Sequence, residues 1–311
     1  MFESRLTPLP YAPWEPTKTT LHLWTQIVGK IRLGATPHRN HWWNVTLVPT
    51  VRGLTTQRMR HGETFFELEF DFVAHRLVAR SGDGAQAPSF ALTDGTSVAE
   101  FYERTLALLR VLGVDAHILG KPYGIPFEAP RFADDHEHRS YDAGAVRRWW
   151  DALLWTADVF DEFASEFAGK QSPAHLFWHG FDLAMARFSG ARAAGPPKTD
   201  AVQQEAYSHE VIAFGFWPGD ANTPGATYYT YTAPEPQTLT EFPLHPEPAA
   251  WYPQGTGHLG GLPYEAVRIS TNPRATLLEF LRSGYEAGTT AVPWRAADLA
   301  STYRSQTVTT T

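Results

Sequence analysis

The N-terminal part of the chain changes from a helical pattern of apolar residues to strand patterns. The first sixteen residues are rich in proline and predict an extended arm, after which apolar residues recur at helical spacing over Leu21–Ile31. The region Trp42–Arg52 is rich in Val, Thr and Trp, which favour strands. Apolar and acidic residues alternate over Phe65–Phe72, which predicts a half-buried strand that pairs with Arg76–Arg80.

A helix and a polar connection follow. Ser97 and Glu100 have the spacing of a capping box, and Gly113 is placed to end the helix that they open. Residues 121–141 are rich in Pro, Asp and His, and they predict an exposed linker that proteases cut early.

The pattern then restarts. The segment Ala145–Phe167 carries an apolar stripe at helical spacing, and His175–Phe188 is too apolar for a loop and predicts one long buried strand. Glu210–Trp217 and Thr227–Thr232 predict a hairpin. A last helix is expected from Asn272, an N-cap followed by proline, to Gly288.

These elements predict an α+β fold with antiparallel or mixed sheets and helices packed on them. We expect an N-terminal half over residues 17–120, the linker 121–141, and a C-terminal half over residues 142–299 that carries the functional site. The similar order of elements suggests that the halves are related by a divergent duplication, which predicts the same strand order in both. The alternative is one continuous α+β domain.

Composition narrows the class of protein. Hydrophobic residues make up 43% of the 311 residues and aromatic residues 14%, which is enough for a large core. The net charge of −7 argues against a general nucleic-acid binder. There is no run of about 18 apolar residues that would span a membrane, and no apolar secretory segment near the start. With no cysteine for disulfides, thiolate catalysis or cysteine metal sites, we expect a cytoplasmic protein.

Familiar motifs are absent or out of context. Gly255, Gly257 and Gly260 match the dinucleotide-binding glycine pattern, but Pro253 precedes them and Pro263 follows, where a strand and a helix would be required. The chain has no phosphate-binding loop of the G-x-x-x-x-G-K-[ST] type and no G-x-S-x-G elbow.

The most informative residues are histidines in the C-terminal half. His175 and His179 are four residues apart, a spacing that places both on one face of either a strand or a helix. His209 and Glu210 begin the next predicted strand. These residues would converge if the two strands were parallel, whereas antiparallel strands would separate them.

Three interpretations of this set stay open. The four residues, His175, His179, His209 and Glu210, could bind a divalent metal such as zinc or iron, for which imidazole and carboxylate are suitable ligands. Alternatively, His175, His179 and Glu210 could carry out acid–base chemistry in a ligand pocket without a metal. In the third interpretation they are hydrogen-bonded core residues.

Other residues are second-rank candidates for ligand contacts. Trp217 ends a predicted strand and could line an aromatic pocket. His41 and Asn44 lie in the segment of the N-terminal half that would correspond to the His175–His179 strand start.

Several blocks of sequence resemble a known family. HWWNVTL, SPAHLFWHGFDLA, RFSG, EAYSHEVIAFGFWPGD and YYTYTAPEP are similar to the signature blocks of a bacterial family catalogued as a domain of unknown function. The similarity runs from about Trp14 to Leu299 and implies one shared architecture, but no cofactor and no catalytic residue.

Our functional hypothesis is therefore an enzyme that acts on a small molecule, not on nucleic acid or at a membrane, through a His/Glu site with or without a metal. The alternative is a non-catalytic small-molecule-binding or regulatory module. A third hypothesis is a scaffold that presents the proline-rich segment Pro234–Pro253 to a protein partner.

Overall fold

The structure is a computed structural model that describes residues 6–193, 200–292, 294 and 296–301. The α-helices of this part are α1 (Tyr11–Ala35), α2 (Val98–Val111), α3 (Ala143–Ala164), α4 (Ala201–Ala206), α5 (Tyr264–Ile269), α6 (Pro273–Ala291) and α7 (Ala296–Leu299). The 3₁₀ turns are η1 (Asn40–Trp42), η2 (Phe132–Asp134) and η3 (Leu239–Glu241). The strands of the N-terminal half are β1 (Val48–Pro49), β2 (Gly53–Thr55), β3 (Met59–His61), β4 (Thr64–Asp71), β5 (Arg76–Ser81) and β6 (Ser89–Ala91). Those of the C-terminal half are β7 (His175–Phe177), β8 (Asp182–Arg192), β9 (His209–Trp217), β10 (Thr227–Ala233), β11 (Ala250–Gln254) and β12 (Gly257–Pro263).

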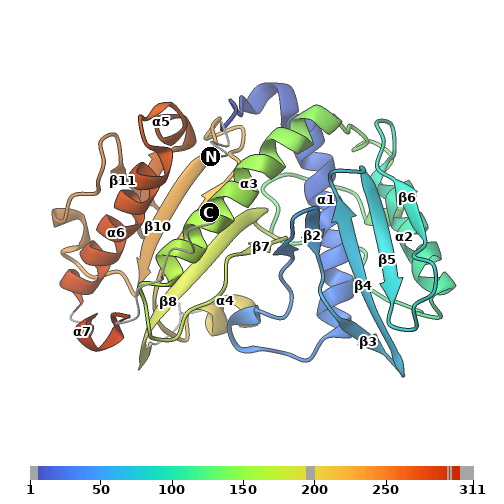
Figure 1. Cartoon of the computed structure of the whole chain (residues 1–311), viewed down its shortest axis with the longest axis horizontal. Coiled ribbons are helices and arrows are strands. Elements are labelled where there is room, and N and C mark those ends of the chain that lie inside the picture. The colour runs from blue at the N-terminus through green and yellow to red at the C-terminus, as the bar shows by residue number, and fades with distance from the viewer. Residues whose placement is uncertain (1–5, 194–199, 293, 295, 302–311) are drawn as a thin grey trace, which may run out of the picture.

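The described strands form two antiparallel six-stranded sheets, one in each half. The N-terminal sheet has the order β1-β2-β4-β5-β6, with β3 also paired to β4, and the C-terminal sheet has the order β11-β12-β10-β9-β8-β7. In Figure 1 the first sheet lies with α1 and α2 on the right, and the second lies with α3 and α6 on the left. The predicted α+β class, with its two halves, is confirmed.

The strand orders of the two halves agree only in part. In each sheet the first strands along the chain pair with their sequence neighbours, with β2 and β3 both pairing with β4. In the first sheet the last strand, β6, pairs with β5 and continues this order. In the second sheet it is β12, not β11, that lies beside β10. The identical order that a simple duplication predicts is therefore not found.

The first helix starts earlier than the sequence pattern predicts. The proline-rich segment is not an extended arm up to residue 16, because α1 begins at Tyr11 and includes Pro16. Tyr11 and Trp14 are buried, and the Trp14 ring lies 6.1 Å from that of Trp149 on α3. This packing outweighs the cost of a proline inside the helix.

Helix α1 is the central element of the core. Trp24 is completely buried, with its ring stacked 4.7 Å from Phe101 of α2 and 5.5 Å from Tyr141. The apolar core around α1 is continuous across both halves. None of the described helices combines the length and apolarity needed to cross a membrane.

The connection between the halves is less exposed than predicted. Apart from η2 it has no helix or strand between residues 121 and 141, but Phe132 and Asp135 are completely buried. The Asp135 carboxylate accepts hydrogen bonds from the backbone N–H groups of Glu137 and His138 and from the His138 ring. Most of the other side chains between residues 121 and 140 are exposed or half-buried, so the stretch is an exposed connection with these two buried residues at its centre.

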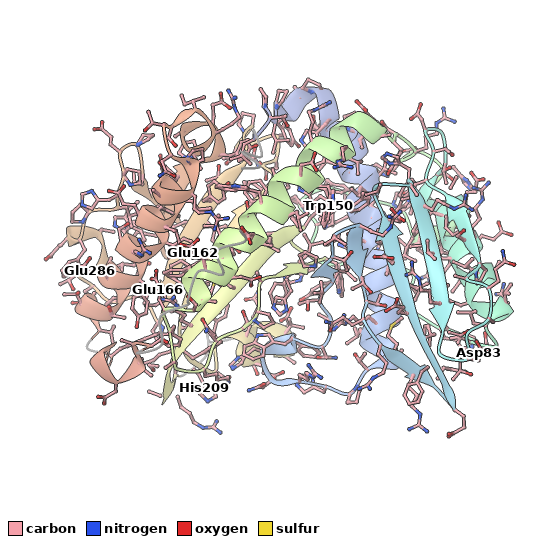
Figure 2. The ribbon with its side chains drawn as sticks, in the orientation of Figure 1. Asp83, Trp150, Glu162, Glu166, His209 and Glu286 are labelled. Atoms are coloured by element: carbon pink, nitrogen blue, oxygen red, sulfur yellow. The ribbon has the colours of Figure 1, made fainter. Side chains whose placement is uncertain are left out.

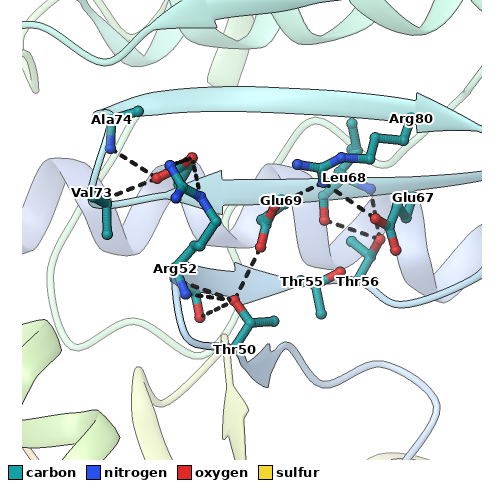
Figure 3. Close-up of polar contacts among 12 residues, drawn as sticks. Thr50, Arg52, Thr55, Thr56, Glu67, Leu68, Glu69, Val73, Ala74 and Arg80 are labelled. Carbon is teal, nitrogen blue, oxygen red and sulfur yellow. Dashed lines mark hydrogen bonds and ion pairs between the residues drawn. The ribbon is translucent and has the colours of Figure 1, made fainter. Parts of the chain in front are cut away.

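The alternation in β4 places apolar residues in the core as predicted. The buried residues on that face are Phe66, Leu68, Phe70 and Phe72. On the other face, Glu69 and Asp71 are also largely covered, because Arg80 and Arg52 lie over them (Figure 3). Arg80 Nη1 lies 2.7 Å from Glu69 Oε2, and Arg52 Nε donates to Asp71 Oδ2 at 2.8 Å.

The position of Trp24 gives a stability prediction. Trp24→Ala should lower the free energy of unfolding in urea by about 3–5 kcal/mol, because it leaves a cavity between α1 and α2. The matched variant Val51→Ala removes an 84% exposed side chain and should change stability little. A loss below about 1 kcal/mol for Trp24→Ala would contradict the central role of α1.

Candidate functional site

A cavity of about 660 Å³ lies between the two halves. One wall is the face of the C-terminal sheet formed by β8, β9 and β10, and the rest comes from α1, α4 and the segments at residues 41–45, 117–123, 172 and 177–179. A volume of this size is typical of sites for small molecules.

The cavity depends on small side chains on one face of the C-terminal sheet. Ala184, Ala186 and Ala213 face the cavity from neighbouring strands. Because side chains alternate along a strand, the residues between them point to the other face, where α3 and α6 cover the sheet. The Phe214 ring, for example, lies 5.0 Å from Phe163 of α3.

Asp182 and Tyr229 form a hydrogen-bonded pair in the cavity wall. The Tyr229 hydroxyl on β10 donates to Asp182 Oδ2 on β8 at 2.5 Å, so the phenol crosses the intervening strand β9. It crosses at Gly215, where an added Cβ would lie 2.2 Å from Tyr229 Cζ. The absence of a side chain at position 215 therefore permits the pair.

The surroundings shift the proton affinity of both groups. Burial raises the pKa of the Asp182 carboxyl above its usual range, although the Tyr229 hydroxyl opposes this shift. Burial and the nearby Asp182 charge raise the pKa of Tyr229 well above 10, so its hydroxyl remains a donor at neutral pH. The Tyr231 and Tyr207 rings also line the cavity, and their hydroxyls lie 3.4 Å apart.

His179 lines the cavity from a tight turn. The predicted long strand His175–Phe188 is wrong, because the chain reverses between β7 and β8. The turn is closed by a hydrogen bond from Phe181 N to Phe177 O at 2.8 Å, and Phe181 has a φ of 56°, which bulky residues rarely adopt. His175 and His179 are consequently on different elements and do not share a strand face.

Helix α1 holds two of the cavity walls in place. His22 Nε2 donates to the His179 carbonyl at 3.0 Å, and the His22 ring stacks on Phe181 at 5.1 Å. The Gln26 side-chain amide donates to the Tyr123 carbonyl at 2.8 Å and accepts a hydrogen bond from the Tyr123 backbone N–H at 2.9 Å. Burial lowers the pKa of His22 to about 3 and that of His179 in the same direction.

His175 lies outside the cavity lining among the described residues. Its side chain is buried, with Nδ1 2.9 Å from Thr46 Oγ1, while Nε2 has no hydrogen-bond partner within the described part of the chain. Burial, together with the charge of Arg32, lowers the pKa of His175 to about 3, so this imidazole is neutral.

His209 and Glu210 are separated from each other and from His175. Strands β8 and β9 are antiparallel, so His209 pairs with Arg192 at the far end of β8, at the lower edge of the molecule in Figure 2. Glu210 points to the opposite face and accepts a hydrogen bond from Ser189 at 2.6 Å. The structure therefore does not bring the four predicted ligands together. Nowhere in the described residues do three or more His, Cys, Asp or Glu side chains form a group that could hold a metal ion.

The second-rank candidates have different positions. His41 lines the cavity, and its ring lies 5.4 Å from that of His209. Asn44 is bonded within its own segment, donating to Thr36 Oγ1 at 3.3 Å, and it does not line the described cavity. Trp217 lies at the other end of β9 and is also outside that lining.

The segment around His41 also differs from the predicted strand over Trp42–Arg52. It forms η1 and a turn before the two-residue strand β1, because His41 and Trp42 adopt φ values of 58° and 62°. Such backbone conformations interrupt a strand.

Sequence reasoning missed the polar residues of the cavity. Asp182 is not among the predicted site residues, and the tyrosines of β10 contribute only to a predicted strand. The pattern that could have located them is the alternation of Tyr229 and Tyr231 opposite small residues of β9, which pair with them as Gly215 and Ala213.

Comparison with known proteins places the chain in a family. The model of the family of unknown function DUF5996 matches residues 6–301. The chain belongs to this family. No curated protein and no solved structure matches the chain. Membership in DUF5996 confirms the resemblance to a family of unknown function, and the chemistry of the site must be argued from its residues.

The buried neutral His175 predicts a pH dependence of stability. The pKa of His175 is lowered to about 3 in the folded state, whereas it is about 6.5 in the unfolded chain. Below about pH 6.5 the unfolded chain therefore takes up a proton that the folded protein does not, and the free energy of unfolding falls as the pH is lowered toward 3. In His175→Gln, the difference in unfolding free energy between about pH 7.5 and 5.5 should shrink by about 1.4 kcal/mol. The matched variant His61→Gln changes an exposed imidazole in β3. An equal pH dependence in His175→Gln and the parent protein would show that His175 is not buried in its neutral form.

Proposed function

We propose that the protein is a cytoplasmic enzyme that acts on a small molecule in the cavity between its halves, by proton transfer at Asp182. The observation that carries this proposal is the hydrogen bond of Tyr229 to Asp182 inside the cavity. Asp182 is also the only acidic residue among the described residues that line it. A cysteine-free composition fits the cytoplasmic location expected from the sequence.

The pair is suited to general acid–base catalysis. A raised pKa brings the Asp182 carboxyl closer to neutral pH, where a group can both accept and donate a proton efficiently. Tyr229 remains protonated and fixes one carboxyl oxygen, which leaves the other oxygen for the substrate. This arrangement holds the reacting oxygen in position before the substrate binds.

His179 supplies a second proton-transfer group in the same wall. Its pKa is lowered by burial, while the neighbouring Asp182 charge acts in the opposite direction. The pKa values of the carboxyl and the imidazole are thus shifted toward each other. Such a pair can accept a proton at one position of a substrate and deliver it to another.

The remaining surface indicates the kind of molecule that fits. The lining is rich in aromatic side chains, and it includes Trp42, Trp43, Phe177, Trp178 and Phe188. These rings favour a substrate with a flat apolar body, whose polar group would lie at the Asp182–Tyr229 pair.

A non-catalytic binding or regulatory module is the second candidate. The apolar rings in the lining favour it, because such surfaces can bind a ligand without any chemical step. It shares the ligand and the cavity with the enzyme hypothesis and differs only in whether the ligand is converted.

The experiment compares conversion by variants that keep the fold. The purified protein is incubated with a small-molecule extract of its source cells, and consumed and formed compounds are followed by mass spectrometry. Asp182→Asn and Tyr229→Phe should lower conversion by at least about tenfold, as expected for loss of a general acid–base group. Gly215→Ala should act similarly, because its Cβ displaces the Tyr229 ring.

Glu210→Gln is the matched control, since Glu210 lies on the opposite face of the same sheet and should be dispensable. Equal losses in Glu210→Gln and Asp182→Asn, with folding intact in both, would contradict the proposed site. A compound that is retained by the parent protein but never converted would favour the binding module.

A further inference from the structure

A second polar pair lies at the border of the same cavity. Lys170 Nζ is 2.7 Å from His41 Nε2 and lies 4.8 Å from the centre of the Phe188 ring and 5.5 Å from that of Trp43. His41, Phe188 and Trp43 all line the cavity. The amine is thus held against one wall by an imidazole and two aromatic rings.

The amine has no carboxylate partner within the described part of the chain. The side chain of Glu205 lies next to the His41 backbone. Its Oε1 already accepts hydrogen bonds from the His38 ring at 2.8 Å and from the His41 backbone N–H at 3.2 Å. Aromatic rings attract an ammonium only weakly and do not neutralise its charge. Burial accordingly lowers the pKa of Lys170 and increases the fraction of free amine.

The hydrogen bonds fix the proton on His41. Its Nδ1 lies 3.2 Å from the backbone carbonyl of Glu205, which can only accept, so Nδ1 carries the proton in the neutral ring. Nε2 is therefore free to accept a proton from Lys170. The neighbouring His209 ring and the Lys170 charge both lower the pKa of His41, after burial, which is the largest cause.

Lys30 is the lysine among the described residues that line the cavity, whereas Lys170 lies behind the lining residues His41, Trp43 and Phe188, but Lys30 is less suitable. Its ammonium lies 5.9 Å from the centre of the Phe132 ring, which is outside the described lining, and no imidazole accompanies it. Lys170 combines an aromatic environment with an adjacent imidazole base, which Lys30 lacks among the described residues.

We propose that Lys170 is a nucleophilic amine that forms an imine with an aldehyde or ketone group of a small molecule bound in this cavity. The inference rests on the proposed function only in using the same cavity. The free amine attacks the carbonyl carbon and forms the C–N bond, and the carbonyl electron pair moves to oxygen, which takes up a proton. His41 Nε2 carries the two amine protons, one after the other, from the nitrogen to this oxygen: the first forms the hydroxyl, and the second lets it leave as water when the C=N bond forms.

The experiment uses benzaldehyde with sodium cyanoborohydride, which reduces an imine to a stable benzylamine. The full-length chain has five lysines, so peptide mass spectrometry can follow the rate at each one. At neutral pH, Lys170 should be modified at least about tenfold faster than the exposed Lys121, because burial lowers the pKa of Lys170 and increases its fraction of free amine. His41→Gln should slow modification at Lys170 and leave the rate at Lys121 unchanged.

Modification of Lys170 no faster than Lys121, or faster modification of Lys30, would overturn the proposal. An unaffected rate at Lys170 in His41→Gln would equally remove the base from the mechanism. The outcome is separable from that of the proposed function. Rapid labelling of Lys170 without conversion of any extract compound would support only the imine site, and conversion without labelling would support only the Asp182 site.

Discussion

The candidate site depends on the absence of a side chain at position 215. Because β9 carries Gly215 between β8 and β10, the Tyr229 ring can lie across it and reach Asp182. Ala184, Ala186 and Ala213 on the same face have small side chains that leave space above the sheet. A cavity therefore remains where the N-terminal half covers it. A larger residue at this point would remove both the hydrogen bond and the space above it.

The position of the N-terminal half is fixed by backbone pairing and by α1. Leu47 and Leu176 exchange hydrogen bonds of 2.9 and 2.7 Å, which joins the edges of the two sheets. On the cavity side, Gly29 of α1 leaves room for the Trp178 indole, and an added Cβ there would lie 2.1 Å from its ring. The indole N–H in turn donates to the Val45 carbonyl at 2.9 Å. The cavity is therefore built from both halves and belongs to neither alone.

The sequence alone predicted correctly those elements that local patterns of polar and apolar residues determine. The Ser97 cap, the helix after Asn272 and the β9–β10 hairpin are all found as predicted, because local hydrogen bonding and periodicity determine them. It was insufficient where long-range packing decides. The strain at Phe181, which turns the chain between β7 and β8, follows from insertion of its ring between α1 and α3 and leaves no local pattern. The same reversal separates His175 from His179, so residue identity and spacing alone could not establish which of the predicted histidines face the cavity. Among the described residues, His179 and His41 line it and His175 does not.

The most direct test of the account is a crystal structure of the protein with a small molecule retained from the extract. The account predicts density for that molecule in the cavity between the halves, with one of its polar atoms within hydrogen-bond distance of Asp182 or Tyr229. Density for the molecule elsewhere on the surface, with the cavity filled by side chains, would contradict it.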